Sequence, residues 1–216
     1  MRVGGRTVTK SSEIVSDSDE IEASAPHPYV SRGGVKLIHA LDAFGINPAG
    51  QIALDIGAST GGFTQVLLER GAERVFAVDV GRDQMHQSLR GDSRVVSLEN
   101  QDARSLTFEQ IGCSPTLLVC DASFISVAAI LPRPLALLAP GALAVVLVKP
   151  QFEVGRVNIG KRGIVKNETL QLQAVQSVSD FLAHHGFAET HRTVSPVTGG
   201  DGNREWFLAA RGGFPR

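Results

Sequence analysis

The stretch Ala53–Thr64, which reads ALDIGASTGGFT, decides the fold. An apolar run leads into it, a glycine-rich turn follows, and Gly62 opens a segment with a helical pattern. In open α/β sheets, ligands bind in the crevice beyond the carboxyl ends of the strands. Glycines let the backbone approach a ligand, and the N-terminus of a helix offers free N–H groups. The stretch therefore predicts a strand–turn–helix unit that binds a ligand at one end of a sheet.

Short β-branched runs in and around this stretch predict five strands, with helical segments between most of them. We expect strands at Gln51–Gly57, Arg74–Val80, Arg94–Glu99, Thr116–Asp121 and Ala142–Lys149, with helices at Gly62–Arg70, Ser126–Ala139 and Glu168–His185. Such alternation is typical of a mostly parallel sheet covered on both faces. Two last strands, at Ala188–Val194 and Glu205–Ala210, are joined by TGGDGN and predict a C-terminal antiparallel hairpin. The expected fold is α/β with a seven-stranded sheet.

Composition excludes several classes of protein. The chain has 216 residues, 43% hydrophobic and 20% charged, which is ordinary for one globular domain and excludes disorder as the main state. Lys and Arg number 21 against 22 Asp and Glu, so bulk charge alone does not predict nucleic-acid binding. Two cysteines, Cys113 and Cys120, make no disulfide scaffold and suggest a reduced cytosolic setting. The longest apolar stretch, Pro134–Val148, contains Pro140-Gly141 and falls short of the roughly 20 residues that a membrane helix needs.

Three nucleotide-like ligands compete for the glycine loop. A phosphate-binding P-loop fits the spacing of Gly57 and Gly62, but Phe63 stands where the essential Lys would be. A dinucleotide-binding loop needs a second glycine where this chain has Ser59, whose side chain would meet the pyrophosphate. S-adenosylmethionine carries no phosphate and needs neither residue, so we favour it.

Four acids at consecutive strand ends support that choice. We expect Asp55 to reach the amino group of the ligand through the loop, and Asp79, 22 residues after Gly57, to take both ribose hydroxyls. Asp102 follows the third strand and suits the adenine amino group, and Asp121 ends the fourth strand. The competing interpretation for each is helix capping or turn chemistry, which Asp favours in any fold.

Lys149 at the end of the fifth strand is the first catalytic candidate, because it points into the same crevice as Asp121. Methylation of an exocyclic amine would favour Asp-Pro-Pro-Tyr or Asn-Pro-Pro-Tyr after the fourth strand. The chain has Asp121-Ala122-Ser123-Phe124 instead, which favours a hydroxyl as the acceptor. Lys149 can act there as a neutral base or as a steering cation, and the sequence leaves both open.

Six motifs together resemble the TlyA (hemolysin A) family within the FtsJ-like ribose 2′-O-methyltransferases: YVSRGGVKL (29–37), DIGASTGGFT (55–64), AVDVG (77–81), CDASFIS (120–126), VKPQFE (148–153) and GGDGNREW (199–206). The resemblance implies a Rossmann-like class I methyltransferase fold. It also implies a Lys-Asp-Lys-Glu tetrad, which falls on Lys36, Asp121, Lys149 and Glu205. S-adenosylmethionine would contact Asp55, Gly57, Ala58, Ser59, Thr60, Gly61, Gly62, Phe63, Asp79, Val80, Asp102, Ala103 and Asp121.

The resemblance further implies a cytidine ribose in ribosomal RNA as the substrate, and ribosomal RNA or ribosomal subunits as partners. Cysteine usage predicts a cytoplasmic location, and since His and Cys residues show no metal-site spacing we expect no metal. Relatives of this kind carry an N-terminal S4-like RNA-binding domain. Residues 1–28 are rich in Ser, Asp, Glu and Pro, and resemble only its closing piece, so we expect a strand remnant and a linker there and the FtsJ-like domain over 29–216.

Basic residues predict where RNA would bind. The segment 149–166 carries a net charge of +4 and is punctuated by glycine, which suits a flap that meets phosphates. The candidates are Arg32, Arg156, Lys161, Arg162 and Lys166, with Tyr29, Phe124 and Phe152 available for base stacking. A non-catalytic factor that binds S-adenosylmethionine and RNA during ribosome assembly is the alternative function, and a small-molecule O-methyltransferase is a third.

Overall fold

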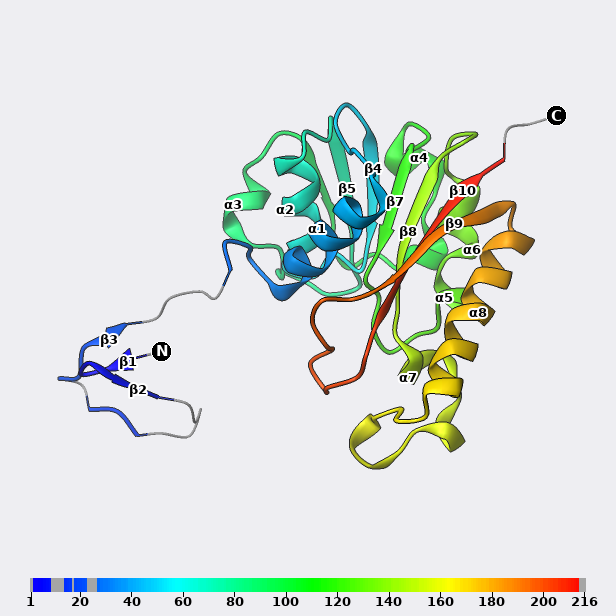
Figure 1. Cartoon of the computed structure of the whole chain (residues 1–216). Helices are drawn as coiled ribbons and strands as arrows, with labels where there is room; N and C mark the ends of the chain where they lie inside the picture. Colours follow the sequence, from blue (N-terminus) through cyan, green and yellow to red (C-terminus); the bar gives the residue numbers. More distant parts are fainter. Residues whose placement is uncertain (1, 9–13, 17, 23–26, 214–216) are drawn as a thin grey trace.

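The main sheet forms where the sequence has its short β-branched and apolar runs. The computed structural model describes residues 2–8, 14–16, 18–22 and 27–213. The main sheet has seven strands: β4 (Ile52–Ile56), β5 (Arg74–Val78), β6 (Val95–Leu98), β7 (Leu117–Cys120), β8 (Leu143–Val148), β9 (Phe187–Val194) and β10 (Trp206–Gly212). Their order is β6-β5-β4-β7-β8-β10-β9 (Figure 1). The predicted α/β sheet and its C-terminal hairpin are confirmed.

Strand direction locates the crevice. β4, β5, β6, β7 and β8 run parallel, whereas β10 runs antiparallel to both β8 and β9. The chain leaves β4 toward β5 on one side and later returns to β7 on the other side. In an open sheet, the ends of two such strands diverge and leave a cleft. The carboxyl ends of β4 and β7 are therefore the expected place for a ligand.

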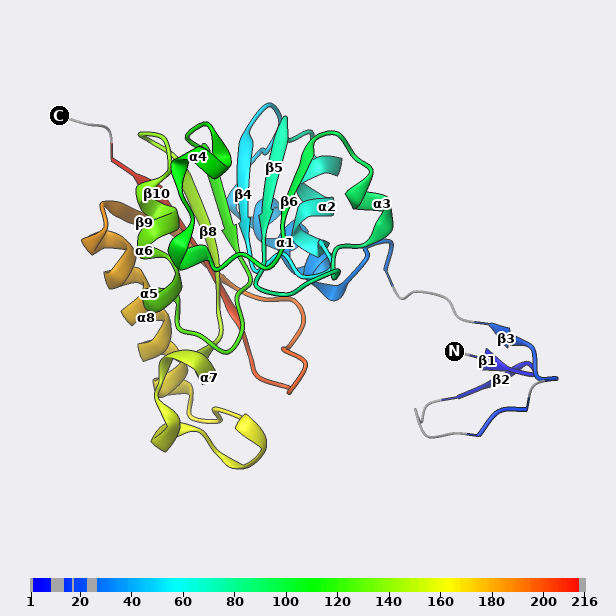
Figure 2. The same cartoon turned by 180° about the vertical axis from the view of Figure 1, so that it is seen from behind.

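Helices cover both faces of this sheet (Figures 1 and 2). Core contacts place α1 (Arg32–Phe44), α2 (Gly62–Glu69) and α3 (Gln87–Arg90) on one face. The other face packs against α4 (Phe108–Ile111), α5 (Val127–Ile130), α6 (Pro132–Ala136) and α8 (Glu168–His184). The short α7 (Pro150–Glu153) follows β8, and 3₁₀ turns lie at Ala103–Ser105, Arg156–Asn158 and Lys161–Gly163.

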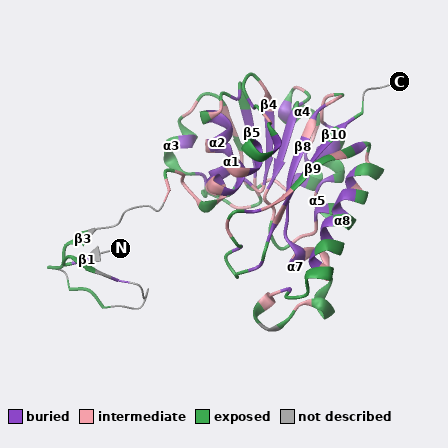
Figure 3. Ribbon diagram, in the orientation of Figure 1, coloured by how far each residue is buried: buried purple, intermediate pink, exposed green. Residues whose placement is uncertain are grey.

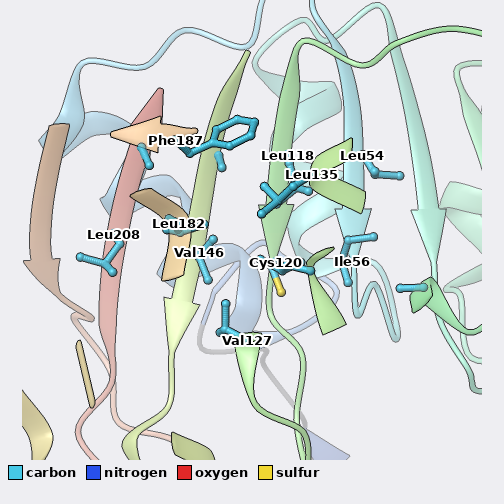
Figure 4. Packing of buried hydrophobic residues seen from close by; sticks show 14 of the residues in the cluster. Leu54, Ile56, Leu118, Cys120, Val127, Leu135, Val146, Leu182, Phe187 and Leu208 are labelled. Carbon is cyan, nitrogen blue, oxygen red and sulfur yellow. The ribbon is translucent and has the colours of Figure 1, made fainter. Parts of the chain in front are cut away.

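The core has two halves that the sheet separates. Along β8, Val146 and Val148 point into one half, while Val145 and Leu147 point into the other. Successive side chains of a strand face opposite ways, so a strand buried on both faces must be apolar throughout. Figure 4 shows the half beneath α5, α6 and α8, and Figure 3 shows that burial concentrates along the strands. This packing fixes the strand ends that carry the candidate site.

The prediction of one helix over Ser126–Ala139 was wrong. The structure has two short helices there, α5 and α6, with Leu131 between them. Pro132 and Pro134 have no N–H to donate to the carbonyl four residues earlier, so a continuous helix would lose two hydrogen bonds. Ile130, the last residue before this break, lines a cavity at the carboxyl ends of the strands.

The N-terminal segment forms a small antiparallel sheet of its own. β1 (Arg2–Val3) pairs with β2 (Arg6–Thr7) and with β3 (Ile21–Glu22). All three strands lie within residues 1–28, where a strand remnant and a linker were expected. Residues 9–13 and 23–26 lie outside the described residues, so the S4-like remnant and the boundary near Pro28 stay predictions.

Among the described residues, the helices are all too short or too polar to cross a membrane.

Candidate functional site

Two adjoining cavities open at the carboxyl ends of β4, β5, β7 and β8. The larger has a volume of about 470 Å³ and the smaller about 200 Å³. They share Gly57, Ser59, Asp121 and Ser123 in their walls. The glycine loop and the end of β7 therefore line one continuous site, at the place that the strand order predicts.

Gly57 lets the glycine loop approach β7. Its φ is +80°, and a Cβ at this position would lie 3.0 Å from the backbone of Asp121 and Ala122. A side chain there would be strained in conformation and would also push the loop away from β7. The narrow junction between the two cavities depends on this close approach.

Asp79 is oriented toward the larger cavity by backbone donors. Its Oδ2 accepts from the Ser59 amide at 2.8 Å, and its Oδ1 accepts from the Gly81 amide at 2.7 Å. Each carboxylate oxygen keeps a further lone pair for a ligand. Asp79 thus ties the glycine loop to the end of β5 and presents a fixed acceptor pair in the cavity.

The larger cavity is otherwise mostly apolar, with Val80, Ala103 and Ile130 in its wall. Asp102 also lines it, but both of its carboxylate oxygens accept from Arg104, one at 2.6 Å. These hydrogen bonds hold the pKa of Asp102 below its ordinary value. Sequence reasoning missed Arg104 and two amides in the same wall, Gln84 and Gln101, because nothing in their local pattern marks a ligand site.

The smaller cavity collects most of the remaining glycine-loop residues. Ala58, Thr60, Gly62 and Phe63 line it together with Ser31, Gly33 and Lys149. Ser31 caps α1 by accepting from the Gly33 amide at 3.2 Å, so the start of that helix closes one side. Gly61 lies in the loop and lines neither cavity.

Asp55 lies behind the loop. It is fully buried, and its Oδ2 accepts from the Thr64 hydroxyl at 2.7 Å. Burial raises the pKa of Asp55 from 3.8 to about 7, which the Thr64 hydrogen bond only partly opposes. Asp55 lines neither cavity, so the structure gives it a place beneath the loop, and its predicted link to the ligand's amino group stays a prediction.

Asp55→Asn is expected to change how stability depends on pH. Between about pH 4 and 7 the unfolded chain has lost the Asp55 proton while the folded chain keeps it. The free energy of unfolding therefore falls by about 4 kcal/mol across this window and then levels off. The variant lacks that contribution. Urea unfolding of both proteins from pH 4 to 8 measures the difference, and parallel curves would contradict the assignment.

The predicted tetrad forms two ion pairs with buried partners. Lys149 Nζ lies 2.6 Å from Asp121 Oδ1 and donates to the Ser123 hydroxyl at 2.6 Å. Lys36 Nζ, from α1, lies 2.5 Å from Glu205 Oε2, just before β10. Burial raises the pKa of Glu205, and the charges of Lys36 and then Lys149 oppose this. The fold thus brings together four residues that are far apart in the sequence.

Gly199 makes room for Glu205. A Cβ on Gly199 would lie 2.7 Å from Glu205 Oε1, so a side chain at this position would force the carboxylate or the loop before β10 to move. Ser123 has a comparable role at Lys149, because its hydroxyl accepts a hydrogen bond from the Lys149 amine. Sequence reasoning missed both roles, although both residues lie in the quoted CDASFIS and GGDGNREW motifs.

The predicted RNA-binding residues lie outside the cavities. Arg32, Arg156, Arg162 and Lys166 are exposed, and the Lys161 side chain lies outside the described part. Arg32 Nη2 lies near Gly200, in the loop that precedes Glu205. Their contact with RNA stays a prediction.

Phe124 stands at the rim of the larger cavity. Its side chain is 92% exposed, its φ is +66°, and its ring centroid lies 5.4 Å from that of Phe152. Such a backbone conformation is costly for a bulky residue, and an exposed aromatic ring gains nothing from burial. The two rings are tilted by 50° and form an apolar surface at this rim, which Asp121 also lines.

Within the described ranges, clusters of three or more His, Cys, Asp or Glu residues with metal-binding geometry are absent.

Comparison with known proteins adds a family model and relatives. The model described as FtsJ-like methyltransferase matches residues 29–212. The 16S/23S rRNA (cytidine-2'-O)-methyltransferase TlyA of Mycobacterium tuberculosis is 44% identical over 98% of this chain and 80% of its own length. A hemolysin-like protein from Streptococcus thermophilus has a solved structure that is 41% identical, with a TM-score of 0.84 over 88% of this chain and 70% of that one. An S-adenosylmethionine-dependent methyltransferase from Mesorhizobium loti shares the fold, with a TM-score of 0.58 over 80% of this chain and 96% of that one, at 17% identity.

Proposed function

Because this chain belongs to the FtsJ-like methyltransferase family, we propose that it methylates the 2′-hydroxyl of a cytidine ribose in ribosomal RNA. The methyl donor is S-adenosylmethionine. The observation that carries the proposal is the Lys149–Asp121 ion pair, which lies where the two cavities meet. A cytoplasmic location follows from a ribosomal substrate.

The residues of the two cavities fit the methyl donor. Asp79 offers two oriented carboxylate oxygens to a ribose, and the apolar wall of Val80 and Ala103 suits an adenine ring. The glycine loop and the start of α2 suit the amino-acid end, because backbone can approach closely there. When bound, S-adenosylmethionine supplies an electrophilic methyl group on a sulfonium. Asp121 and Lys149 lie beside the place for that group.

The Lys149–Asp121 pair suits work on a hydroxyl. Lys149 is held by Asp121 and Ser123, so its amine has one fixed position. The ribose hydroxyl must release its proton as its oxygen attacks the methyl carbon. Lys149 Nζ, after it has passed one proton to solvent, accepts that proton and returns to the ammonium form that Asp121 Oδ1 stabilises. The Lys36–Glu205 pair lines neither cavity, but the charge of Glu205 interacts with Lys149 and Asp121. Positioning of the two reactants is the main contribution of the site.

Phe124 and the basic segment suit an RNA substrate. An exposed ring at the cavity rim can stack on a base whose ribose reaches Asp121 and Lys149. Arg156, Arg162 and Lys166 add positive charge for phosphates. Because the net charge of the chain is −1, bulk charge does not attract RNA. Selection of the RNA therefore depends on these local features and on base pairing within the substrate.

Radiolabelled methyl transfer to ribosomal subunits tests the function. We expect label from S-adenosylmethionine to enter the RNA of subunits purified from a strain that lacks the enzyme, in an amount that approaches one methyl per site. Subunits from the parent strain, already methylated, are the matched control. Donor binding without transfer to any subunit would favour the assembly factor. Transfer to small hydroxylated molecules but not to RNA would favour the third candidate.

Asp79→Ala is expected to weaken donor binding by 10- to 100-fold. The change removes the acceptor pair for the ribose and the hydrogen bonds that tie Ser59 and Gly81 together. Hydrogen bonds to a charged group contribute about 1.5–3 kcal/mol each. Isothermal titration with S-adenosylmethionine measures the affinity. Asp83→Ala, on an exposed side chain nearby, is the control, and equal affinities of the two variants would contradict the role of Asp79.

A further inference from the structure

Asn203 joins the loop before β10 to the segment that contains Gly163 and Val165. Its side-chain amide donates to the Gly163 carbonyl at 2.8 Å and to Asp201 Oδ2 at 2.8 Å, and its Oδ1 accepts from the Val165 amide at 2.9 Å. The residue is 1% exposed, so every polar atom of this amide is buried and paired. A buried amide with full pairing holds its neighbours in one arrangement, because any other arrangement leaves polar atoms unsatisfied.

The same network ends two residues in sequence from one member of each ion pair of the tetrad. Asp201 accepts from the Gln151 amide at 3.2 Å, and Gln151 lies in α7, two residues after Lys149. Asn203 itself lies two residues before Glu205. The hydrogen bonds thus connect the end of β8, the start of β10 and the segment 156–166, which we call the basic loop. Figures 1 and 2 show the basic loop and the segment before β10 at the same end of the sheet.

The basic loop carries the charges that suit RNA. Arg156, Arg162 and Lys166 are exposed on it, and Gly163 and Val165 are the two places where Asn203 holds it. Val165 is also held from the other side, since its carbonyl accepts from Gln171 of α8 at 2.7 Å. Without Asn203 the loop therefore keeps its attachment to α8 and loses its attachment to the segment before Glu205.

We propose that Asn203 is a positioning residue that sets the basic loop relative to Glu205 and Lys149, so that phosphates bound by the loop place the target ribose at the tetrad. This inference rests on the proposed function. It assigns the GGDGN part of the motif a role in substrate alignment, separate from donor binding and from the reaction itself. Asn203 touches neither cavity, which agrees with an indirect role.

A double-mutant cycle between Asn203→Ala and Arg162→Ala tests the proposal. We expect each single change to raise KM for ribosomal subunits about tenfold and to flatten the dependence of KM on salt. The double variant is expected to match the single variants, since a misplaced loop has no phosphate contact left to lose. The affinity for S-adenosylmethionine is expected to stay within twofold. Asn47→Ala, an exposed amide in the loop before β4, is the control.

Two outcomes would overturn the inference. Effects that multiply to about a hundredfold would show that Asn203 acts independently of the loop, and loss of donor affinity would show a general structural role. Should Asn203→Ala fail to fold, Asn203→Ser serves instead, because it adds no charge beside Asp201 and its shorter side chain does not span the distance that the amide covers to Gly163. If the unmodified protein transfers no methyl to subunits, the proposed function fails, and the cycle is then measured on the dissociation constant for subunits alone.

Discussion

Lys149→Ala is expected to lower kcat of methyl transfer by about 10³-fold and to leave donor affinity within twofold. General acid–base groups contribute about 10²–10⁴-fold, and Lys149 also holds Asp121 in place. The amine borders the smaller cavity without bonding to the glycine loop, so its loss leaves the donor site intact. Single-turnover transfer to ribosomal subunits measures the rate, and titration with S-adenosylmethionine measures the affinity.

The control for this variant is Arg74→Ala, which removes an exposed cation at the opposite end of the sheet, where β5 begins. It is expected to keep full activity. Ser123→Ala offers a graded comparison, since it removes one of the partners of Lys149 and is expected to lower kcat less than Lys149→Ala does. Full activity of Lys149→Ala would contradict the assignment of the reacting centre.

Glu205→Ala is expected to cost about 3 kcal/mol of stability in addition to activity. Lys36 would be left buried with its charge uncompensated, and breaking a buried ion pair costs about 3–5 kcal/mol. The double variant Lys36→Met with Glu205→Leu replaces the pair by apolar side chains of similar size. It is expected to regain most of the stability and to remain inactive. Urea unfolding measures the free energy of each variant.

This comparison separates two reasons for keeping the ion pair. Buried pairs are poor contributors to stability when an apolar pair fits the same space, so the pair is explained by what it does at the site. An active double variant would show that Lys36 and Glu205 have no part in the reaction. A double variant as unstable as Glu205→Ala would show that the pair has a structural role that apolar packing does not replace.

Much of the fold could be predicted because the sheet is buried on both faces. Strands such as β8 are then continuous apolar runs, and the alternation of strands with helices gives the sheet its parallel order. Local propensity failed at Ser126–Ala139, where Pro132 and Pro134 interrupt a helical pattern. Because the strands could be predicted, their carboxyl ends could be predicted too. The closeness of Asp121 and Lys149, which lie at two of these ends, could therefore be expected from the sequence.

The rest of the site depends on contacts that no local pattern reveals. The sequence gives no sign that the Asp102 carboxylate has a partner. In the structure, both of its oxygens accept hydrogen bonds from Arg104, two residues later. Asn203 meets Gly163 across 40 residues, and glycine-rich turns leave such a pairing undetermined. A phenylalanine such as Phe124 is more often found in the core, yet here its φ is positive and its ring is exposed.

The position of the transferred methyl group tests the central claim most directly. Ribosomal RNA treated with the enzyme and S-adenosylmethionine is digested to nucleosides and separated by mass spectrometry beside standards of each methylated cytidine. We expect 2′-O-methylcytidine, formed by the unmodified protein and absent with Lys149→Ala. A methyl group on a base, or 2′-O-methylcytidine formed equally well without the Lys149 amine, would contradict it.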